Sequence, residues 1–113
     1  MSGISRRILE LANQVDALKY GKFILSSGQE SQYYFDGRRL TLHAEGSYLV
    51  GKAIWSLLVK AEIKAIGGPT LGADPIVTAV AIASHLEGKG INAFIVRKAV
   101  SYTHLPLPTS DLV

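Results

Sequence analysis

The sequence predicts an α/β domain in which a parallel sheet is flanked by helices and an N-terminal hairpin forms a hood. Three observations support this fold class. Two near-continuous apolar runs, residues 63–66 and 91–96, read as buried parallel strands. A glycine-rich segment and an apolar helical stretch lie between them, as in a βαβ unit. Upstream, two short aromatic segments are joined by a Ser-Ser-Gly turn.

Composition limits the protein to one globular domain with a mild positive charge. Of 113 residues, 48% are hydrophobic and 19% charged, and 12 basic against 9 acidic residues give a net charge of +3. Dense basic clusters are absent, so we expect no nucleic acid as partner. The mild charge fits an anionic small molecule, and it equally fits an explanation that involves no charged ligand. The lack of cysteine excludes disulfides and is compatible with a reducing compartment. No stretch resembles a membrane span or signal peptide, so we expect a cytoplasmic protein.

The N-terminal segment predicts a helix followed by a hairpin. Apolar residues recur at spacings of three and four between residues 4 and 18, the pattern of an amphipathic helix. Residues 17–25 and 32–36 then read as strands around the turn at 26–29. The second strand carries Tyr33, Tyr34 and Phe35 in succession. Core packing is the ordinary explanation for each ring, but alternation along a strand must turn at least one to the opposite face.

The next segment predicts a second amphipathic helix beginning at Ala44. Its apolar stripe is expected at Leu49, Ala53, Ile54, Leu57, Leu58 and Ala61. Trp55 lies beside this stripe, so we expect it at an edge or interface and not in the core. Before the helix, the neighbouring Arg38 and Arg39 are interpreted as a solvated pair. No catalytic group is identified on this helix.

The glycine-rich segment 67–75 is the main candidate for ligand binding. Asp74 is expected to cap the following helix, with Pro75 in its first turn. The glycines at 67, 68 and 72 would allow positive φ and close approach to a ligand. Free amides beside a helix N-terminus suit a phosphate or diphosphate. The alternative is an ordinary strand-to-helix turn without a ligand.

Two cations favour the phosphate interpretation. The helix expected over residues 76–86 is apolar on nearly all sides and ends at Gly88 and Gly90. Arg97 and Lys98 then follow the strand 91–96 directly. Ligands of open α/β sheets bind at the carboxyl ends of the strands, the edge where the glycine-rich loop also lies.

Residues 99–113 differ in character from the rest of the chain. They show no periodicity and include Pro106 and Pro108, so we expect an unstructured tail. The run Val-Ser-Tyr-Thr-His-Leu at 100–105 also resembles a translated frame of the transposon end used in sequencing libraries. We interpret the tail as a non-native extension of a truncated gene. The alternative is an ordinary disordered C-terminus.

Residues 4–98 resemble the bacterial orotate phosphoribosyltransferases. The most specific matches are ALKYGKF at 17–23, SG at 27–28 with YYFD at 33–36, GGPTLGADP at 67–75, and FIVRK at 94–98. The resemblance implies a truncated type I phosphoribosyltransferase fold, with residues 1–98 forming the N-terminal part of that domain. It also implies transfer of ribose 5-phosphate from phosphoribosyl diphosphate to orotate, giving orotidine 5′-phosphate and diphosphate in de novo pyrimidine synthesis.

The resemblance further implies Mg²⁺ as cofactor and specific roles for individual residues. Tyr34 and Phe35 match hood positions that enclose orotate. Thr70, Leu71 and Gly72 match the loop that binds the diphosphate through its amides. Arg97 and Lys98 match cations on phosphoribosyl diphosphate, the lysine serving a neighbouring subunit, so a homodimer with shared active sites is implied.

Departures from the family pattern lead us to expect an inactive fragment. Ser26 stands where some members carry a lysine, so one phosphate contact is absent or supplied differently. The mobile catalytic loop and the acidic, glycine-rich ribose-phosphate loop that follow position 98 in the family have no counterpart here, and no catalytic residue is assigned. Two alternatives stay open: a non-catalytic nucleotide-sensing module of the same fold, and an α/β fragment without a ligand.

Overall fold

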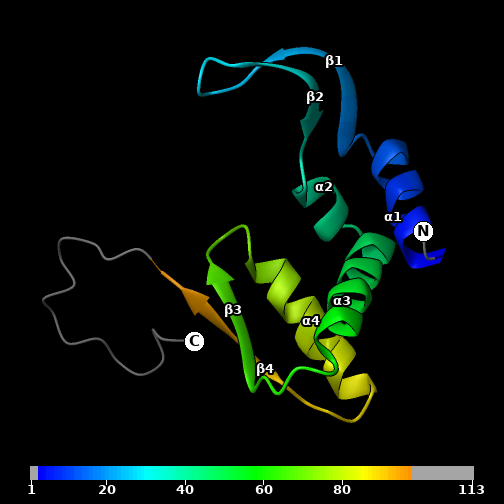
Figure 1. The fold of residues 1–113 in the computed structure, drawn as a ribbon, viewed down its shortest axis with the longest axis vertical. Helices are drawn as coiled ribbons and strands as arrows, with labels where there is room; N and C mark the ends of the chain where they lie inside the picture. Colours follow the sequence, from blue (N-terminus) through cyan, green and yellow to red (C-terminus); the bar gives the residue numbers. More distant parts are fainter. Residues whose placement is uncertain (1–2, 98–113) are drawn as a thin grey trace, which may run out of the picture.

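The computed structural model describes residues 3–97 and confirms the α/β fold class (Figure 1). Lys98 and the predicted tail 99–113 lie outside the described residues. The elements, in chain order, are α1 (Gly3–Gln14), β1 (Leu18–Ile24), β2 (Glu30–Phe35), α2 (Arg38–Thr41), α3 (Ala44–Leu58), β3 (Ala65–Pro69), α4 (Asp74–Leu86) and β4 (Asn92–Val96).

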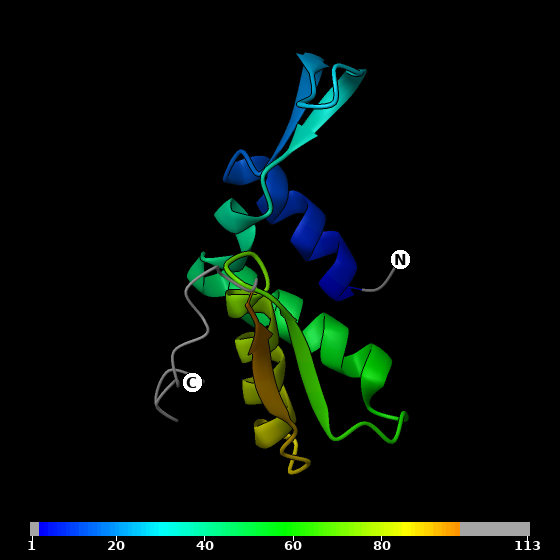
Figure 2. The same cartoon turned by 90° about the vertical axis from the view of Figure 1, so that its left-hand side faces the viewer.

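The predicted hood is an antiparallel hairpin of β1 and β2 that projects away from the helices (Figures 1 and 2). Its register pairs Leu18 with Phe35 and Ile24 with Glu30. An irregularity lies between Tyr20 and Phe23, where Gly21 adopts φ 151°, a backbone conformation that favours glycine. The hairpin therefore reaches beyond the core and holds its aromatic strand in solvent.

The predicted parallel βαβ unit is also present. β3 and β4 pair in parallel from Ala65–Asn92 to Pro69–Val96, and α4 connects them. In Figure 2 the two strands lie in front of α4, so the helix covers one face of the sheet. Phe94 and Val96 lie on the opposite face and are more than half exposed. This face of the sheet is bare within the described part of the chain.

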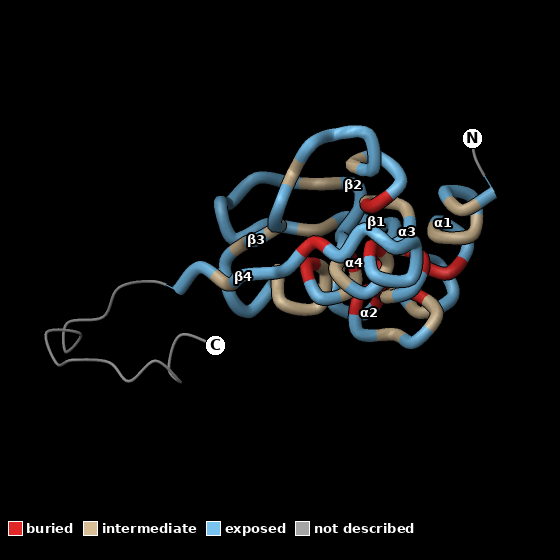
Figure 3. Tube along the Cα trace, turned by 90° about the horizontal axis from the view of Figure 1, so that it is seen from below, coloured by how far each residue is buried: buried red, intermediate tan, exposed pale blue. Residues whose placement is uncertain are grey.

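The core consists of two clusters on either side of α3. One joins α1, α2 and the start of α3 through Leu11, Leu40 and Leu49. The other joins α3, α4 and the start of β4 through Trp55, Val80 and Ile91. Burial concentrates between the helices, while β3 and β4 are mostly exposed (Figure 3).

Trp55 corrects the expectation for α3. It was placed at an edge or interface, but its side chain is only 2% exposed, whereas Leu57, expected on the apolar stripe, is 82% exposed. The reason is the close approach of α3 and α4 at Gly51. A Cβ there would lie 2.6 Å from the carbonyl oxygen of Ala79, so only glycine allows this contact. Because of this contact, the side of α3 that carries Gly51 and Trp55 packs against α4, and Leu57 is left in solvent.

The glycine-rich segment also differs from expectation. β3 continues through Gly67 and Gly68 to Pro69, and none of the glycines at 67, 68 and 72 has a positive φ. At position 67 an added Cβ would meet the outer atoms of the Phe94 ring, so that ring would have to shift, and at 68 it would lie 2.5 Å from the Cβ of Ala73. Here glycine serves strand packing and the tight turn.

The Asp74 cap was also predicted wrongly. The residue before α4 is Ala73, without a side-chain cap, and Asp74 is the first helical residue. Its carboxylate instead accepts a hydrogen bond from the Thr70 hydroxyl at 3.1 Å. Asp74 therefore ties the loop after β3 to the start of α4.

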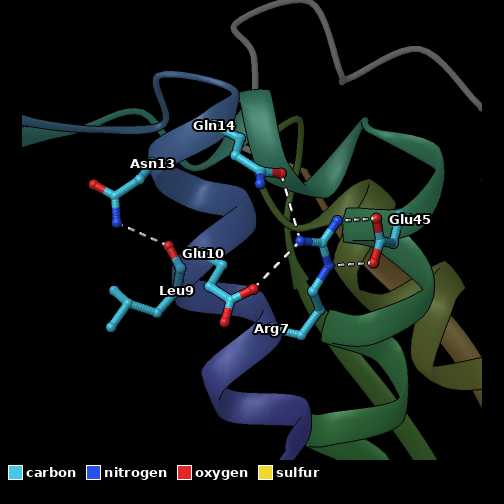
Figure 4. Close-up of polar contacts among 6 residues, drawn as sticks. All are labelled: Arg7, Leu9, Glu10, Asn13, Gln14 and Glu45. Carbon is cyan, nitrogen blue, oxygen red and sulfur yellow. Dashed lines mark hydrogen bonds and ion pairs between the residues drawn. The ribbon is translucent and has the colours of Figure 1, made fainter.

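An ion pair fixes α1 against α3 (Figure 4). The Arg7 guanidinium donates two hydrogen bonds to the Glu45 carboxylate, at 2.6 and 2.7 Å, and also contacts Glu10. This bidentate arrangement lowers the pKa of Glu45 and raises that of Arg7, chiefly through the hydrogen bond between them.

Within residues 3–97, no helix combines the length and apolarity that crossing a membrane requires.

Candidate functional site

A cavity of about 670 Å³ lies between the base of the hairpin and the loop after β3. Its walls come from the end of β2, from α2, and from the loop that leads into α4. Four of the residues predicted for the site from sequence line it: Tyr34, Phe35, Leu71 and Gly72. Segments some 35 positions apart in the chain are thus brought to one concave surface.

The hairpin side of this cavity is aromatic. Tyr34 and Phe35 are about half exposed, so core packing does not explain either ring. The Tyr34 ring lies 5.8 Å from that of Phe23 across the hairpin. The Phe35 ring is close to Gly37, where an added Cβ would be 3.2 Å away. Two partly fixed, exposed rings at the edge of a cavity suit a flat, unsaturated ligand.

The loop side presents backbone amides. The Thr70 amide donates to the Val96 carbonyl at 3.0 Å, and the Ala73 and Asp74 amides donate to Pro69 and Leu71 at 3.0 and 3.1 Å. The amides of Leu71 and Gly72 have no hydrogen-bond acceptor among residues 3–97. These two residues line the cavity. Two donors thus remain for an anionic ligand at the position that the sequence indicated.

Thr70 and the predicted cations occupy different positions. Thr70 starts the loop, and its hydroxyl is engaged by Asp74. Arg97 follows β4 at the same edge of the sheet, because the amide of Thr70 binds the carbonyl of the preceding Val96. Neither Thr70 nor Arg97 lines the cavity, and Lys98 lies outside the described residues. Ser26 is in the turn of the hairpin and does not line the cavity either.

Sequence reasoning missed the charged residues of the cavity. Asp36 and Arg38 line it, and Arg39 lies next to them. The adjacent arginines read as solvated because their local pattern carries no sign of a cavity. Their position depends on α2, a single turn that the sequence did not predict. One feature of the sequence could have indicated that Asp36 and Arg38 lie at the cavity: they directly follow the strand with the aromatic residues.

Residues 3–97 offer no group of three or more His, Asp or Glu side chains that fits a metal ion. Asp36 is an acid in the cavity, and its carboxylate contacts Arg38 and Arg39. The described residues therefore do not fit a protein-held Mg²⁺ site, and we assign no metal ligand to them.

Comparison with known proteins confirms the predicted resemblance. No family model matches the chain. A protein named orotate phosphoribosyltransferase from a Nostoc species is 47% identical over 98 residues, which is 87% of this chain and 47% of that protein. One of the same name from Thermosynechococcus vestitus is 51% identical over 83 residues, 74% of this chain and 43% of its own length. The chain spans about half the length of the curated relatives it matches.

Solved structures agree in fold. A crystal structure of orotate phosphoribosyltransferase from Mycobacterium tuberculosis H37Rv has a TM-score of 0.73 at 40% identity, covering 85% of this chain and 55% of that one. Another structure of that enzyme, in complex with 5-phospho-α-D-ribosyl 1-diphosphate, has a TM-score of 0.65 at 31% identity, covering 88% and 49%. Residues 3–97 thus have the fold of about half of such a protein.

Proposed function

We propose that this chain is the N-terminal part of an orotate phosphoribosyltransferase, and that it supplies the base-binding hood and the diphosphate-binding loop of that enzyme. The observation that carries the proposal is that one cavity is lined by Tyr34 and Phe35 on one side and by Leu71 and Gly72 on the other. The relatives' name gives the class of reaction, phosphoribosyl transfer to orotate. The donor, phosphoribosyl diphosphate, and the place of the reaction in pyrimidine synthesis follow from the sequence resemblance.

Each wall of the cavity has a task in this reaction. Tyr34 and Phe35 form the aromatic wall against which orotate lies, and they exclude water from it. The amides of Leu71 and Gly72 donate to the diphosphate, where negative charge accumulates as the bond to the ribose carbon breaks. Arg97 is a further positive charge near that diphosphate at the sheet edge, and Lys98 serves the neighbouring subunit's site. Thr70 acts through Asp74 by fixing the loop.

Mg²⁺ and a second subunit belong to the proposal for the whole enzyme. Mg²⁺ bound to phosphoribosyl diphosphate would neutralise part of its charge, and we assign none of its ligands to residues 3–97. A homodimer would bring Lys98 of one subunit to the partner's site. No catalytic residue is assigned within this chain, so we expect it to be inactive alone.

Ligand binding to the 113-residue chain tests the proposal. Titration calorimetry should detect orotate and phosphoribosyl diphosphate, and both should raise Tm with the logarithm of one plus their concentration over Kd. Tyr34→Ala should weaken orotate binding and leave phosphoribosyl diphosphate unaffected. Preference for purine nucleotides over orotate would instead favour a regulatory module, and no response to either substrate would contradict the proposal.

Activity requires a longer chain. Residues 1–98 joined to the remaining half of the Nostoc relative should form orotidine 5′-phosphate from the two substrates, measured by loss of orotate absorbance. The 113-residue chain is the matched control and should show no turnover. A folded chimera that binds both substrates without turnover would contradict the assignment of this chain as half of the enzyme.

A further inference from the structure

Arg38 is a cavity cation to which the proposed function gives no role. It lines the cavity together with Leu71 and Gly72, and it is the one lysine or arginine among the lining residues of the described chain. Its side chain is 70% exposed, so the guanidinium is available to a ligand. Arg97 is not among these lining residues, and Lys98 lies outside the part of the chain that the structure describes.

The charges around Arg38 leave it only partly neutralised. Asp36 is shared by two arginines: its carboxylate lies 4.0 Å from Nε of Arg38 and 3.6 Å from Nε of Arg39. The Arg38 amide also donates to Asp36 at 3.3 Å, which fixes the backbone at the start of α2. Two guanidinium groups against one carboxylate leave a net positive charge beside the cavity.

The opposite wall supplies neutral donors. The Leu71 and Gly72 amides lack an acceptor within the described residues, and the Leu71 side chain carries no charge. A guanidinium and two amides around one cavity match a group with several anionic oxygens, because each oxygen accepts a charge-assisted hydrogen bond. A diphosphate provides such oxygens. A planar base would instead contact the aromatic wall of the cavity.

We propose that Arg38 is a substrate-binding residue that holds the diphosphate of phosphoribosyl diphosphate against the Leu71–Gly72 amides. This inference rests on the proposed function and deepens it, since it names a charged side chain of the cavity that would hold the diphosphate. Arg39 provides a matched control, because it pairs with the same carboxylate without lining the cavity.

The experiment measures the affinity of the 113-residue chain for inorganic diphosphate and for orotate by calorimetry, in metal-free buffer at low ionic strength. Arg38→Gln should weaken diphosphate binding about tenfold or more and change orotate binding less than about twofold. Arg39→Gln should change both less than about twofold. Arg38→Lys should restore part of the diphosphate affinity and tests the charge separately from any effect on folding.

Each outcome decides between the proposals. Equal diphosphate affinities for Arg38→Gln and Arg39→Gln would overturn the role of Arg38. Loss of orotate binding alone in Arg38→Gln would also overturn it, because the arginine would then serve the base. A chain that binds orotate but no diphosphate would overturn this inference and leave the base-binding hood standing, while a chain that binds neither would end both proposals.

Discussion

Ser84 shows how one buried polar side chain closes the βαβ unit. It is fully buried in α4, its hydroxyl donates to the Ala81 carbonyl at 2.7 Å, and it accepts from the Ile91 amide at 3.0 Å. The second bond fixes the point where the chain leaves the turn after α4 and enters β4. The hydroxyl thus satisfies a buried donor that no strand neighbour reaches.

Ser84→Ala should therefore destabilise the chain by about 1–3 kcal/mol, because it leaves the buried Ile91 amide without an acceptor. Ser56→Ala is the matched control: that hydroxyl also donates to a helical carbonyl, at 2.7 Å, but is exposed, and its loss should cost less than about 0.5 kcal/mol. Urea denaturation gives both values. Equal costs would show that the Ile91 amide finds water or another acceptor.

Gly51 is the second decisive residue, since its missing Cβ sets the distance between α3 and α4. Gly51→Ala should cost about 1–3 kcal/mol through overpacking against Ala79, despite the better helix propensity of alanine. Gly3→Ala in α1 meets no atom within 4 Å and should be neutral or stabilising. Thermal unfolding of the two variants measures the difference, and a stabilised Gly51→Ala would contradict the close packing.

At the scale of elements, α1 is attached to α3 by the bidentate Arg7–Glu45 pair. Because the pKa of Glu45 is lowered in the folded state from its ordinary 4.5, the pair contributes stability above that value and loses it as the pH falls through the folded pKa. The contribution of the pair to stability is modest, because the Arg7 and Glu45 side chains are 35% and 41% exposed and solvent screens their charges.

The expected result is a fall in Tm on acidification below about pH 4.5 that is smaller in Glu45→Gln than in the unmodified chain. Glu10→Gln serves as control, because Glu10 contacts the same arginine through a single 3.5 Å approach. Its Tm should fall with pH as in the unmodified chain. A pH profile unchanged by Glu45→Gln would mean that other carboxylates dominate acid unfolding.

The elements also show what sequence could predict. Periodicity and turn residues were enough for α1, the hairpin and the βαβ unit, because local patterns determine them. The position of the glycine-rich segment was also predicted, but its backbone conformation and the cap of α4 were not. Trp55 and Leu57 were assigned the wrong way round because the choice depends on the Gly51 contact, which no local pattern reveals. Arg38 was missed for the same reason: its place in the cavity follows from how α2 packs against distant segments.

At the scale of the whole molecule, the described fold buries only one face of its parallel sheet. Parallel sheets are ordinarily covered on both faces, yet Phe94 and Val96 remain exposed opposite α4. The edges of β3 and β4 away from their shared ladder have no further strand within residues 3–97. The matched relatives are about twice as long, so their remaining half is the natural source of cover for this face.

A substitution at Val96 tests whether the second half of the relatives covers this face, by comparing its effect in two proteins. In the 113-residue chain, Val96→Thr replaces an exposed methyl group by a hydroxyl and should change the free energy of unfolding by less than about 0.5 kcal/mol. In the chimera with the second half of the Nostoc relative, the same hydroxyl would be buried without a partner and should cost about 1–3 kcal/mol. Denaturant unfolding of the four proteins gives the comparison.

The carbonyl of residue 96 still accepts from Thr70 in every case, so a difference reports on the side chain alone. Equal costs in both contexts would mean that the second half covers some other surface, and the exposed sheet face would then need a different occupant.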